Sequence, residues 1–298
     1  MMRALSLLTA TLVLAACAAE GPTPAVSGQA ASLALPPAAL PSYKVGDQVT
    51  WSNGQTETVV AIDGEVVRWR DQDGNTYSSY RNFVLPSLAW DYPTTKAETR
   101  IPVAADTLWP LQPGNDAHFK VHQRLVAKIH NSEVAYFDEW GCRVMGAEKV
   151  KIKLGRFDTY KVRCSRFWQG SNVGEITWNY APALGRVVRR NWTGAEEPEE
   201  LVAIGHGAID AKAEKVAARL RQRGLENLAS GAKAIGKTNW MQAAIQPRAT
   251  FVTSKGAVCR DFLQTIVTRQ GRATSAGTAC RAEDGKWQVV DKIKAKEE

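Results

Sequence analysis

The chain of 298 residues almost lacks long hydrophobic runs. Its one long uncharged apolar run, Ala4–Ala16, covers about 13 residues, whereas a helix needs ~20 residues to cross a ~30 Å hydrocarbon core. A protein with several membrane-spanning helices is therefore excluded. Hydrophobic residues still make up 44% of the chain. Because that share is normal for globular domains, a wholly disordered chain is excluded as well.

Residue patterns that carry catalysis are also missing. The sequence has four His and contains no Gly-x-Ser-x-Gly, His-Glu-x-x-His or glycine-rich phosphate loop. His118 and His122 lie in an alternating segment that reads as a strand, which places them ~13 Å apart, too far to share one metal ion. Asp138 and Glu139 are adjacent, so in a strand they point to opposite faces. We predict no enzyme, no metal site and no cofactor.

The first residues read as an export signal. Arg3 is followed by the uncharged run, and the run ends in Leu14-Ala15-Ala16-Cys17, a pattern typical of a secretory signal peptide covering residues 1–16. The ending resembles the lipobox of bacterial lipoproteins. That resemblance implies cleavage before Cys17 and acylation of its thiol, with palmitate among the chains. Ala18 after the cysteine implies the outer membrane. The alternative is an ordinary secretion signal that happens to end beside a cysteine.

A spacer follows the leader. Residues 17–42 are rich in Ala and Pro, and Glu20 is the only charged residue among them. The segment shows neither helical nor strand periodicity, so it cannot form a core. In extended form, at ~3.1 Å per residue, it could hold the folded part up to ~70 Å from the membrane.

Residues 43–85 predict a small antiparallel meander. Turn signals at Asn53-Gly54, Asp63-Gly64 and 71–75 recur about every ten residues between alternating segments. The pattern is similar to that of SH3-like barrels, which often bind peptides or cell-wall fragments. Two roles remain open for the aromatic residues of this segment: they line such a groove, or they fill a small core. These residues are Trp51, Trp69, Tyr77 and Tyr80.

A stretch rich in Pro and Trp leads to a second β segment, residues 114–193. Several of its runs alternate apolar and polar residues with period two, and we expect turns at 155–159 and 181–185. The Gly-Arg-Phe-Asp-Thr-Tyr-Lys-Val run and the Trp-x-Tyr-Ala-Pro-x-Leu-Gly run resemble curved-sheet periplasmic proteins of the lipoprotein-carrier type, some of which hold lipid. The resemblance implies a bent antiparallel sheet and no particular site.

From about Leu201 the chain turns helical. Residues 206–235 are rich in Ala, Lys, Arg, Glu and Leu, with one apolar face surrounded by basic residues. We expect Gly224 and Gly231 to end or kink the helix. The helix either lies on an anionic membrane surface or packs on its own domain with its charges in water. Its apolar face consists of Ile209, Ala213, Val216 and Leu220.

After Trp240 the pattern returns to β. Cys259 and Cys280 lie almost equally far from a turn at Gln270-Gly271, so a hairpin places them opposite each other and within disulfide range. Gly277 could supply a bulge that corrects a one-residue offset.

The motifs of this region resemble a known family. Cys259-Arg-Asp-Phe, followed by Gly277-Thr-Ala-Cys-Arg-x-x-Asp-Gly-x-Trp-x-Val-Val, is similar to the C-terminal domain of the rickettsial-type 17-kDa surface antigens, a family of outer-membrane lipoproteins. The resemblance covers about 70 residues. The family's glycine zipper is absent, so a membrane-inserting role does not transfer. The resemblance implies no catalytic residue.

Five cysteines leave an even number once Cys17 is set aside. In an oxidising compartment we expect two bridges by proximity, Cys259–Cys280 and Cys142–Cys164. Four cysteines allow three pairings, and the sequence alone does not choose among them. A zinc site is disfavoured because no Cys-x-x-Cys pair is present.

Charge is unevenly distributed along the chain. Residues 1–200 carry 21 basic and 21 acidic residues, whereas residues 201–298 carry 17 and 9, so the whole net charge of +8 lies in the C-terminal part. Such asymmetry indicates an anionic neighbour, such as lipopolysaccharide or peptidoglycan, or simply favours solubility. An exported, acylated protein would rarely meet nucleic acid.

Together these features predict a mainly β (α+β) protein in four parts: a signal peptide (1–16), a lipidated linker (17–42), a β-rich region (43–200) and a helix with a surface-antigen-like, disulfide-linked hairpin unit (201–298). The expected location is the outer membrane, on its periplasmic face or at the cell surface, with a lipid anchor and a structural or antigenic envelope role. The alternative is a periplasmic module that binds a lipid or another apolar ligand in the curved β segment.

Overall fold

The computed structural model describes residues 33–101 and 106–290. The described residues belong to one compact unit that starts at Leu33. Cys17, the predicted leader and most of the predicted spacer lie outside them. Strands dominate, which confirms the predicted mainly β fold. Among the described residues, no helix combines the length and apolar character that a membrane crossing requires.

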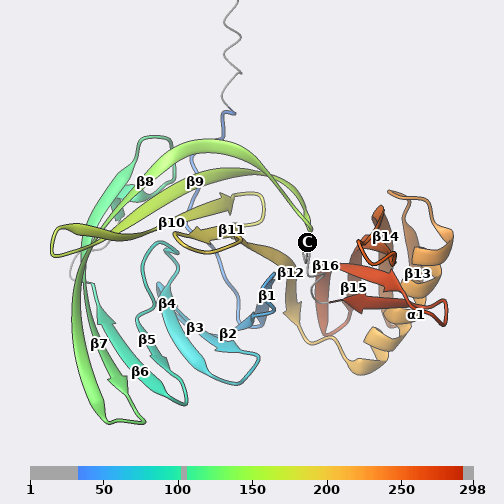
Figure 1. Ribbon diagram of the computed structural model, residues 1–298, viewed down its shortest axis with the longest axis horizontal. Coiled ribbons are helices and arrows are strands. Elements are labelled where there is room, and N and C mark those ends of the chain that lie inside the picture. Colours follow the sequence, from blue (N-terminus) through green and yellow to red (C-terminus); the bar gives the residue numbers. More distant parts are fainter. Residues whose placement is uncertain (1–32, 102–105, 291–298) are drawn as a thin grey trace, which may run out of the picture. The chain divides into compact units, whose positions relative to one another are not determined.

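Twelve antiparallel strands close into a barrel. Each strand pairs with the next one along the chain, and β1 also pairs with β12, so the sheet has no free edge there (Figure 1). The strands are β1 (Asp47–Trp51), β2 (Thr56–Asp63), β3 (Val66–Asp71), β4 (Thr76–Tyr80), β5 (Ala89–Asp91), β6 (Thr95–Arg100), β7 (Asp116–Ala127), β8 (Ser132–Ile152), β9 (Gly155–Trp168), β10 (Ser171–Ala181), β11 (Arg186–Trp192) and β12 (Glu199–Gly207).

The two β segments expected from the sequence share this one sheet. β1 to β4 come from residues 43–85 and β7 to β11 from residues 114–193, and β5 and β6 connect them. Trp51 and Trp69 are buried in the barrel core, with Tyr77 packed against that core. These aromatic residues therefore fill the core; they do not line an external groove.

The predicted turns at Asn53-Gly54, 71–75 and 181–185 are confirmed, since each lies between consecutive strands. The turn expected at 155–159 is wrong. β9 already begins at Gly155, and the hairpin turns over Lys153 and Leu154. The reason is that β8 and β9 remain paired up to Ile152 and Gly155, where a two-residue turn suffices.

One end of the barrel is filled by three connecting segments, residues 33–42, 81–88 and 106–115. They supply Ala38, Val84, Leu85, Leu108 and Leu111 to a common apolar cluster. Residues 106–108 form a short 3-10 helix, η1 (Asp106–Leu108), and Ala38 pairs with Leu111. We refer to these three segments as the cap.

Two tyrosines of the barrel hold the first cap segment. Tyr160 Oη donates to the carbonyl oxygen of Leu35 at 2.7 Å, and Tyr180 Oη donates to that of Ala39 at 3.1 Å. Both side chains are almost completely buried. The cap is therefore attached to the barrel by hydrogen bonds as well as by apolar packing.

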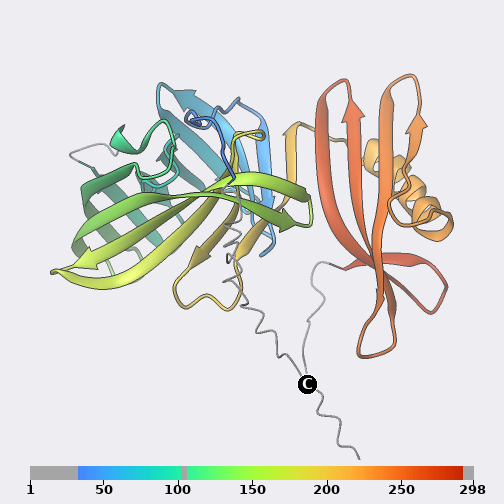
Figure 2. The same ribbon diagram turned by 90° about the horizontal axis from the view of Figure 1, so that it is seen from above.

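The C-terminal part consists of five strands and one helix. They are α1 (Ala211–Asn227), β13 (Ala234–Lys237), β14 (Met241–Val252), β15 (Val258–Thr268), β16 (Gly271–Arg281) and β17 (Trp287–Val290). The strands pair in chain order, and α1 packs along one face of them (Figure 2). β16 also pairs with β12, from Gly271–Ser275 to Ala203–Gly207.

α1 is shorter than the helix-compatible range at both ends. Asp210 caps its start by accepting from the backbone N–H of Ala213, so His206 lies in β12, before the helix. Ala213 is buried and Val216 and Leu220 are partly buried against the C-terminal strands. The apolar face is thus covered by the chain itself, which favours the second of the two predicted roles.

Gly224 does not end the helix, contrary to expectation. It faces Ile245 so closely that a Cβ atom there would lie 2.6 Å from Ile245 Cγ2. The glycine lets the helix approach β14, and the helix runs on to Asn227. Gly231, the other expected helix breaker, lies beyond the helix end.

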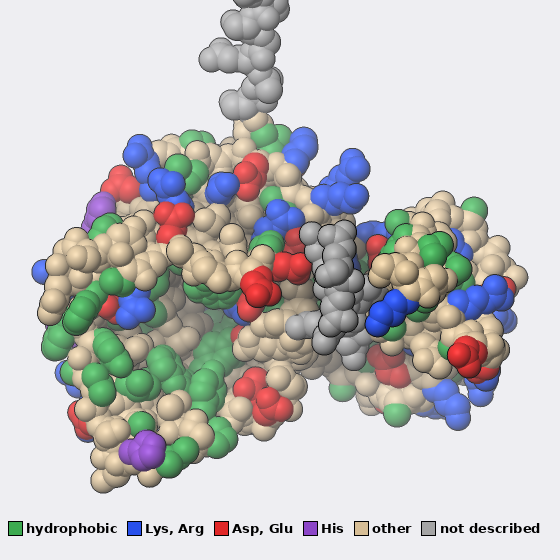
Figure 3. Space-filling model, in the orientation of Figure 1, with side chains coloured by type: hydrophobic (Ala, Val, Ile, Leu, Met, Phe, Trp, Pro, Cys, Tyr) green, Lys and Arg blue, Asp and Glu red, His purple; other side chains and the backbone are tan. Residues whose placement is uncertain are grey.

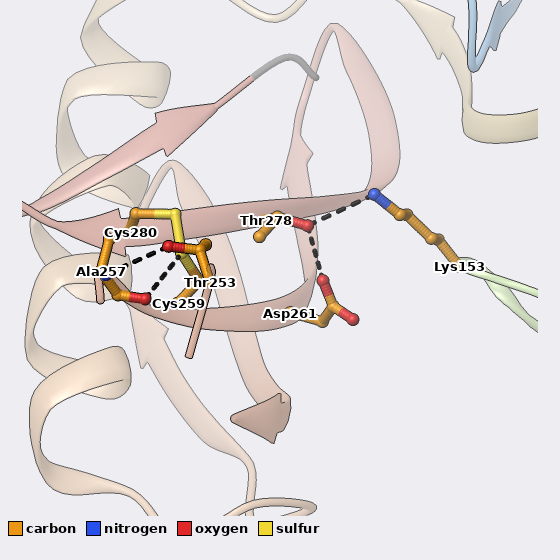
Figure 4. Close-up of a disulfide and its surroundings, with 7 residues drawn as sticks. All are labelled: Lys153, Thr253, Ala257, Cys259, Asp261, Thr278 and Cys280. Atoms are coloured by element: carbon orange, nitrogen blue, oxygen red, sulfur yellow. Dashed lines mark hydrogen bonds between the residues drawn. A yellow bond between two sulfur atoms is a disulfide. The ribbon is translucent and has the colours of Figure 1, made fainter. Parts of the chain in front are cut away.

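Two disulfides join facing strands. Cys142 of β8 bonds to Cys164 of β9, and Cys259 of β15 bonds to Cys280 of β16. These are the two pairings expected from proximity. Figure 4 shows the second bridge, near which Thr278 Oγ1 donates to Asp261 and accepts from Lys153 Nζ.

The bulge expected at Gly277 is absent. β15 and β16 pair without a register shift from Cys259↔Cys280 to Val267↔Arg272. Gly277 instead makes room for the ring of Phe262, whose Cζ would lie 2.8 Å from a Cβ at that position. The equal spacing of the cysteines from the turn therefore already sets the register.

Candidate functional site

The strongest candidate site is the interior of the barrel, which we call the lumen. Eight strands make a barrel just wide enough for side chains to fill, and the diameter grows with strand number. Twelve strands therefore enclose more space than eight, and two packed apolar clusters fill part of it. Figure 3 shows a hollow in the barrel, with hydrophobic side chains gathered in it.

The cap closes one end of the lumen, and short turns border the other. In an antiparallel meander, alternate connections lie at the same end. The connections 52–55, 72–75, 128–131 and 169–170 therefore surround the end opposite the cap. We refer to this open end as the mouth.

Among the large apolar residues exposed near the mouth, three occupy inward-facing strand positions. Val134 is 46% exposed, Trp168 49% and Trp192 39%. By strand alternation and register each lies on the inward face: Val134 pairs with Leu125, Trp168 is two residues beyond Arg166, and Trp192 pairs with the buried Ile176. Burying such side chains in contact with an apolar ligand is favourable by about 25 cal/mol per Å².

Further inside, aromatic rings form the wall. The rings of Phe119 and Trp140 are stacked with centroids 6.2 Å apart, and Trp178 and Trp192 meet edge to face at 6.1 Å. Trp178 also lies 5.6 Å from Phe83 of the cap. The wall is therefore continuously aromatic from β7 through β8 and from β10 to β11.

An ion pair lies on this wall where β9 ends. Arg166 Nη2 is 2.8 Å from Asp138 Oδ2, and Arg166 Nε donates to the same oxygen at 3.0 Å. The Asp138 side chain is 6% exposed and that of Arg166 is 42% exposed. The second carboxylate oxygen of Asp138, Oδ1, has no hydrogen-bond partner among the described residues.

A second ion pair joins β11 to β12. Arg190 Nε is 2.6 Å from Glu199 Oε2, and the Arg190 guanidinium lies 4.1 Å from the ring centre of Trp51. Glu57 accepts from Trp51 Nε1 at 3.1 Å. Burial, reinforced by a hydrogen bond with Glu57, raises the pKa of Tyr77 well above its usual value. The inward arginines thus each have a carboxylate partner.

Another hollow, of about 610 Å³, is lined mostly by outward-facing residues of β7, β8 and β9, and Phe119 and Trp140 also contribute to its lining. His118 and His122 both line it. They alternate with buried residues along β7 and so point outward, as expected for a strand. Lys120 Nζ is 3.3 Å from Glu139 Oε1, and both residues line the hollow. Within the described ranges, no group of three or more His, Cys, Asp or Glu is placed to hold a metal ion.

Sequence reasoning separated Asp138 from Glu139 correctly: Asp138 is buried and Glu139 is exposed. It did not identify Arg166, Trp178 or Trp192 as residues of a site. The number of Trp residues, ten in one chain, was the available signal, because Trp side chains supply large apolar surfaces with a polar N–H.

Comparison with known proteins shows which family the C-terminal part resembles. Residues 235–288 match the model of the 17 kDa outer membrane surface antigen family. The 17 kDa surface antigen of Rickettsia bellii (strain RML369-C) is 34% identical over 90 residues, which are 30% of this chain and 56% of that protein. The antigen of Rickettsia prowazekii (strain Madrid E) is 35% identical over 72 residues, 24% of this chain and 45% of that protein.

The predicted resemblance of the C-terminal part to this family is thereby confirmed. The chain spans about half the length of the curated relatives it matches. Two solved structures also share some similarity. The hypothetical lipoprotein YmcC from Escherichia coli is 14% identical with a TM-score of 0.37, covering 52% of this chain and 80% of that one. A putative exported protein from Bacteroides fragilis is 15% identical with a TM-score of 0.32, covering 55% and 97%.

Proposed function

We propose that this protein is a non-enzymatic lipoprotein of the bacterial outer membrane, anchored by acyl chains on Cys17. The observation that carries the proposal is the surface-antigen match at residues 235–288, combined with the Leu-Ala-Ala-Cys sequence at the end of the leader. Two or three acyl chains exceed the marginal binding of a single chain, so the anchor would be stable.

The test is a Cys17→Ser variant in a Gram-negative host fed with labelled palmitate. The unmodified chain should incorporate label and sediment with outer membranes, while Cys17→Ser should lose the label completely. Ala18→Ser, one residue away, serves as the matched control and should still incorporate palmitate. Label in the Cys17→Ser product, or none in the parent chain, would exclude this anchor.

The basic charge of the C-terminal part supports the proposal of an anionic envelope partner, such as lipopolysaccharide or peptidoglycan. Its excess of basic residues is distributed over α1 and the strands, and Lys212, Lys215 and Arg223 of α1 are exposed. Charges of one sign on a surface raise the local concentration of opposite charges.

A second function is favoured by the lumen: binding of an apolar ligand. The exposed inward side chains of Val134, Trp168 and Trp192 support it, since large apolar groups that remain in contact with water mark binding sites more often than ordinary surface. The two functions are compatible, because an acyl anchor on Cys17 would tether the barrel to a lipid bilayer.

A further inference from the structure

Four exposed basic side chains form one line along α1, and we refer to them as the basic stripe. They are Lys212, Lys215, Arg219 and Arg223. At 3.6 residues per turn they fall within an arc of about 80° of the helix circumference, over ~16 Å of its length. The buried residues of the helix are centred about 160° around it from the stripe. These are Ala213, Ala217, Gly224 and Leu225, on the side where the strands lie in Figure 2.

The charge of the stripe is not neutralised within the described part of the chain. None of its four side chains has a carboxylate oxygen within 4.0 Å there. Glu226 lies on the same side of the helix, but Arg281 Nη2 and Trp287 Nε1 each bind its carboxylate at 2.9 Å. Glu214 projects about 100° away from Lys215 around the helix. The positive charge of the stripe is therefore available to an external partner.

The stripe also lies where it destabilises the helix. Lys215 and Arg219 are four residues apart, as are Arg219 and Arg223, and like charges at this spacing repel each other. Lys212 is in the first turn, near the positive end of the helix dipole, while the last turn, where cations are favourable, contains none. In return Lys212 Nζ lies 4.7 Å from the ring centre of Trp240, which does not neutralise its charge. Breaking several local rules on one exposed surface indicates a binding role.

The shape of this surface indicates a flat partner. The exposed side of a helix is convex, so the four side chains diverge, whereas recognition of a single phosphate or carboxylate takes several donors that converge on it. A flat layer of negative charge can reach all four at once. A bilayer with anionic headgroups is such a layer, and each Lys or Arg near its surface strengthens binding roughly fivefold.

From this arrangement we propose that the basic stripe of α1 docks on the surface of a bilayer that carries anionic phosphate headgroups. The contact is electrostatic and does not insert into the bilayer, because Val216 and Leu220 pack against the C-terminal strands. It therefore differs from the binding of a free amphipathic helix. The assignment rests on the anionic envelope partner proposed above, and adds the docking surface and the chemical class of the partner. It does not depend on the acyl anchor.

The experiment uses the chain from Ala18 onward, which retains the whole compact unit beginning at Leu33 and carries no acyl group of its own. Its binding to sucrose-loaded vesicles is measured by cosedimentation. The vesicles contain phosphatidylcholine, either alone or with about 30% phosphatidylglycerol. We expect at least tenfold tighter binding to the anionic vesicles. That binding should weaken at least tenfold between roughly 0.1 and 0.5 M NaCl, because salt screens contacts between exposed charges.

Two pairs of substitutions with the same change in net charge locate the contact. Lys215→Gln with Arg219→Gln removes the middle of the stripe. Lys255→Gln with Arg269→Gln removes two exposed charges from the turns before and after β15. We expect at least tenfold weaker binding for the first pair and less than a threefold change for the second. Because Gln, Lys and Arg have similar helix propensities, and the first pair relieves repulsion within α1, its melting temperature should not fall.

The outcomes separate this contact from the function on which it rests. Equal binding to neutral and anionic vesicles, or an equal loss for the two pairs of substitutions, would overturn the assignment to the stripe. If the chain binds purified peptidoglycan and not anionic vesicles, the anionic partner stands and the bilayer is the wrong occupant. If it binds neither of these nor lipopolysaccharide, the anionic partner is wrong as well. The anchor on Cys17 is judged independently, by the palmitate label.

Discussion

Two tyrosines, the buried Tyr180 and the partly buried Tyr43, should make the fold sensitive to alkaline pH. Burial raises the pKa of Tyr43 and that of Tyr180 to about 12, from an ordinary value of 10.0. Because the folded pKa lies above the unfolded one, the stabilisation is complete below pH 10 and is lost as the pH rises toward 12. We expect the melting temperature to fall over this window, together with late appearance of tyrosinate absorbance.

Replacing both phenols isolates their contribution. Tyr43→Phe with Tyr180→Phe should flatten the decline between pH 10 and 12, although not abolish it, because the pKa of Tyr77 and that of Tyr160 are also raised, mainly by burial. At neutral pH the double variant should lose about 1 kcal/mol, the worth of the hydrogen bond from Tyr180 to Ala39. An unchanged slope would refute the assignment.

Individual residues were predictable where their role follows from local pattern. Cys259 and Cys280 lie equally far from a turn, and pairing alone places them opposite each other. The Asp138–Arg166 pair was not predictable, since the two residues lie 28 positions apart and meet only because β8 and β9 are long and in a particular register. Alternation indicates which face a side chain occupies, and it does not identify the neighbour on the next strand.

At the scale of elements, the close packing of α1 on β14 yields a prediction. In an isolated helix Gly→Ala is stabilising by about 1 kcal/mol. Here a Cβ at Gly224 would lie 2.6 Å from Ile245 Cγ2, and overpacking costs typically 1–3 kcal/mol. We expect Gly224→Ala to lower the free energy of unfolding, measured by urea denaturation.

The neighbouring Arg223→Ala is the matched control. Arg223 is exposed, and Arg and Ala have similar helix propensities, so this change should be nearly neutral. A stabilised Gly224→Ala protein would show that the helix and β14 are farther apart than the structure has them.

Elements whose signals are local were predicted well. Asn53-Gly54 forms the expected hairpin turn, because Gly54 adopts the positive φ, 91°, that the turn requires. Gly155 misled the prediction for the opposite reason: its φ is not in the left-handed region, and it simply opens β9. Glycine within a strand pattern has several causes, and its sequence context does not distinguish them.

At the scale of the whole molecule, closure of the barrel could not be predicted from the sequence. β1 pairs with β12 from Asp47↔His206 to Trp51↔Leu201, residues that lie 159 and 150 positions apart in the chain. Periodicity shows that each segment is a strand with one buried face, and it contains no information about which distant strand will pair with it. The two β segments were therefore predicted as separate units, while the lumen exists only once they join.

The joint between β11 and β12 is the weakest place in the closed barrel. Only two residue pairs connect them, Arg189↔Glu200 and Arg190↔Glu199, compared with twelve between β7 and β8. Both pairs are reinforced by ion pairs, at 2.7 and 2.6 Å. After these two pairs, β12 leaves β11 and pairs with β16. β12 therefore belongs both to the barrel and to the C-terminal sheet, and its pairing with β11 is the shortest in the barrel.

Local opening should therefore begin at this joint. We expect hydrogen exchange to be faster for peptides covering β11 and the start of β12 than for those covering β7 and β8, since fewer contacts must break. Glu199→Gln with Glu200→Gln should increase that exchange at least tenfold, because two half-buried guanidinium groups lose their charged partners. Glu133→Gln, which removes an exposed ion pair with Arg124, should have almost no effect. If exchange at this joint is as slow as in β7 and β8, closure depends instead on the shared packing of Trp51, Leu201 and Val188 beneath the joint, and the lumen has no lateral opening there.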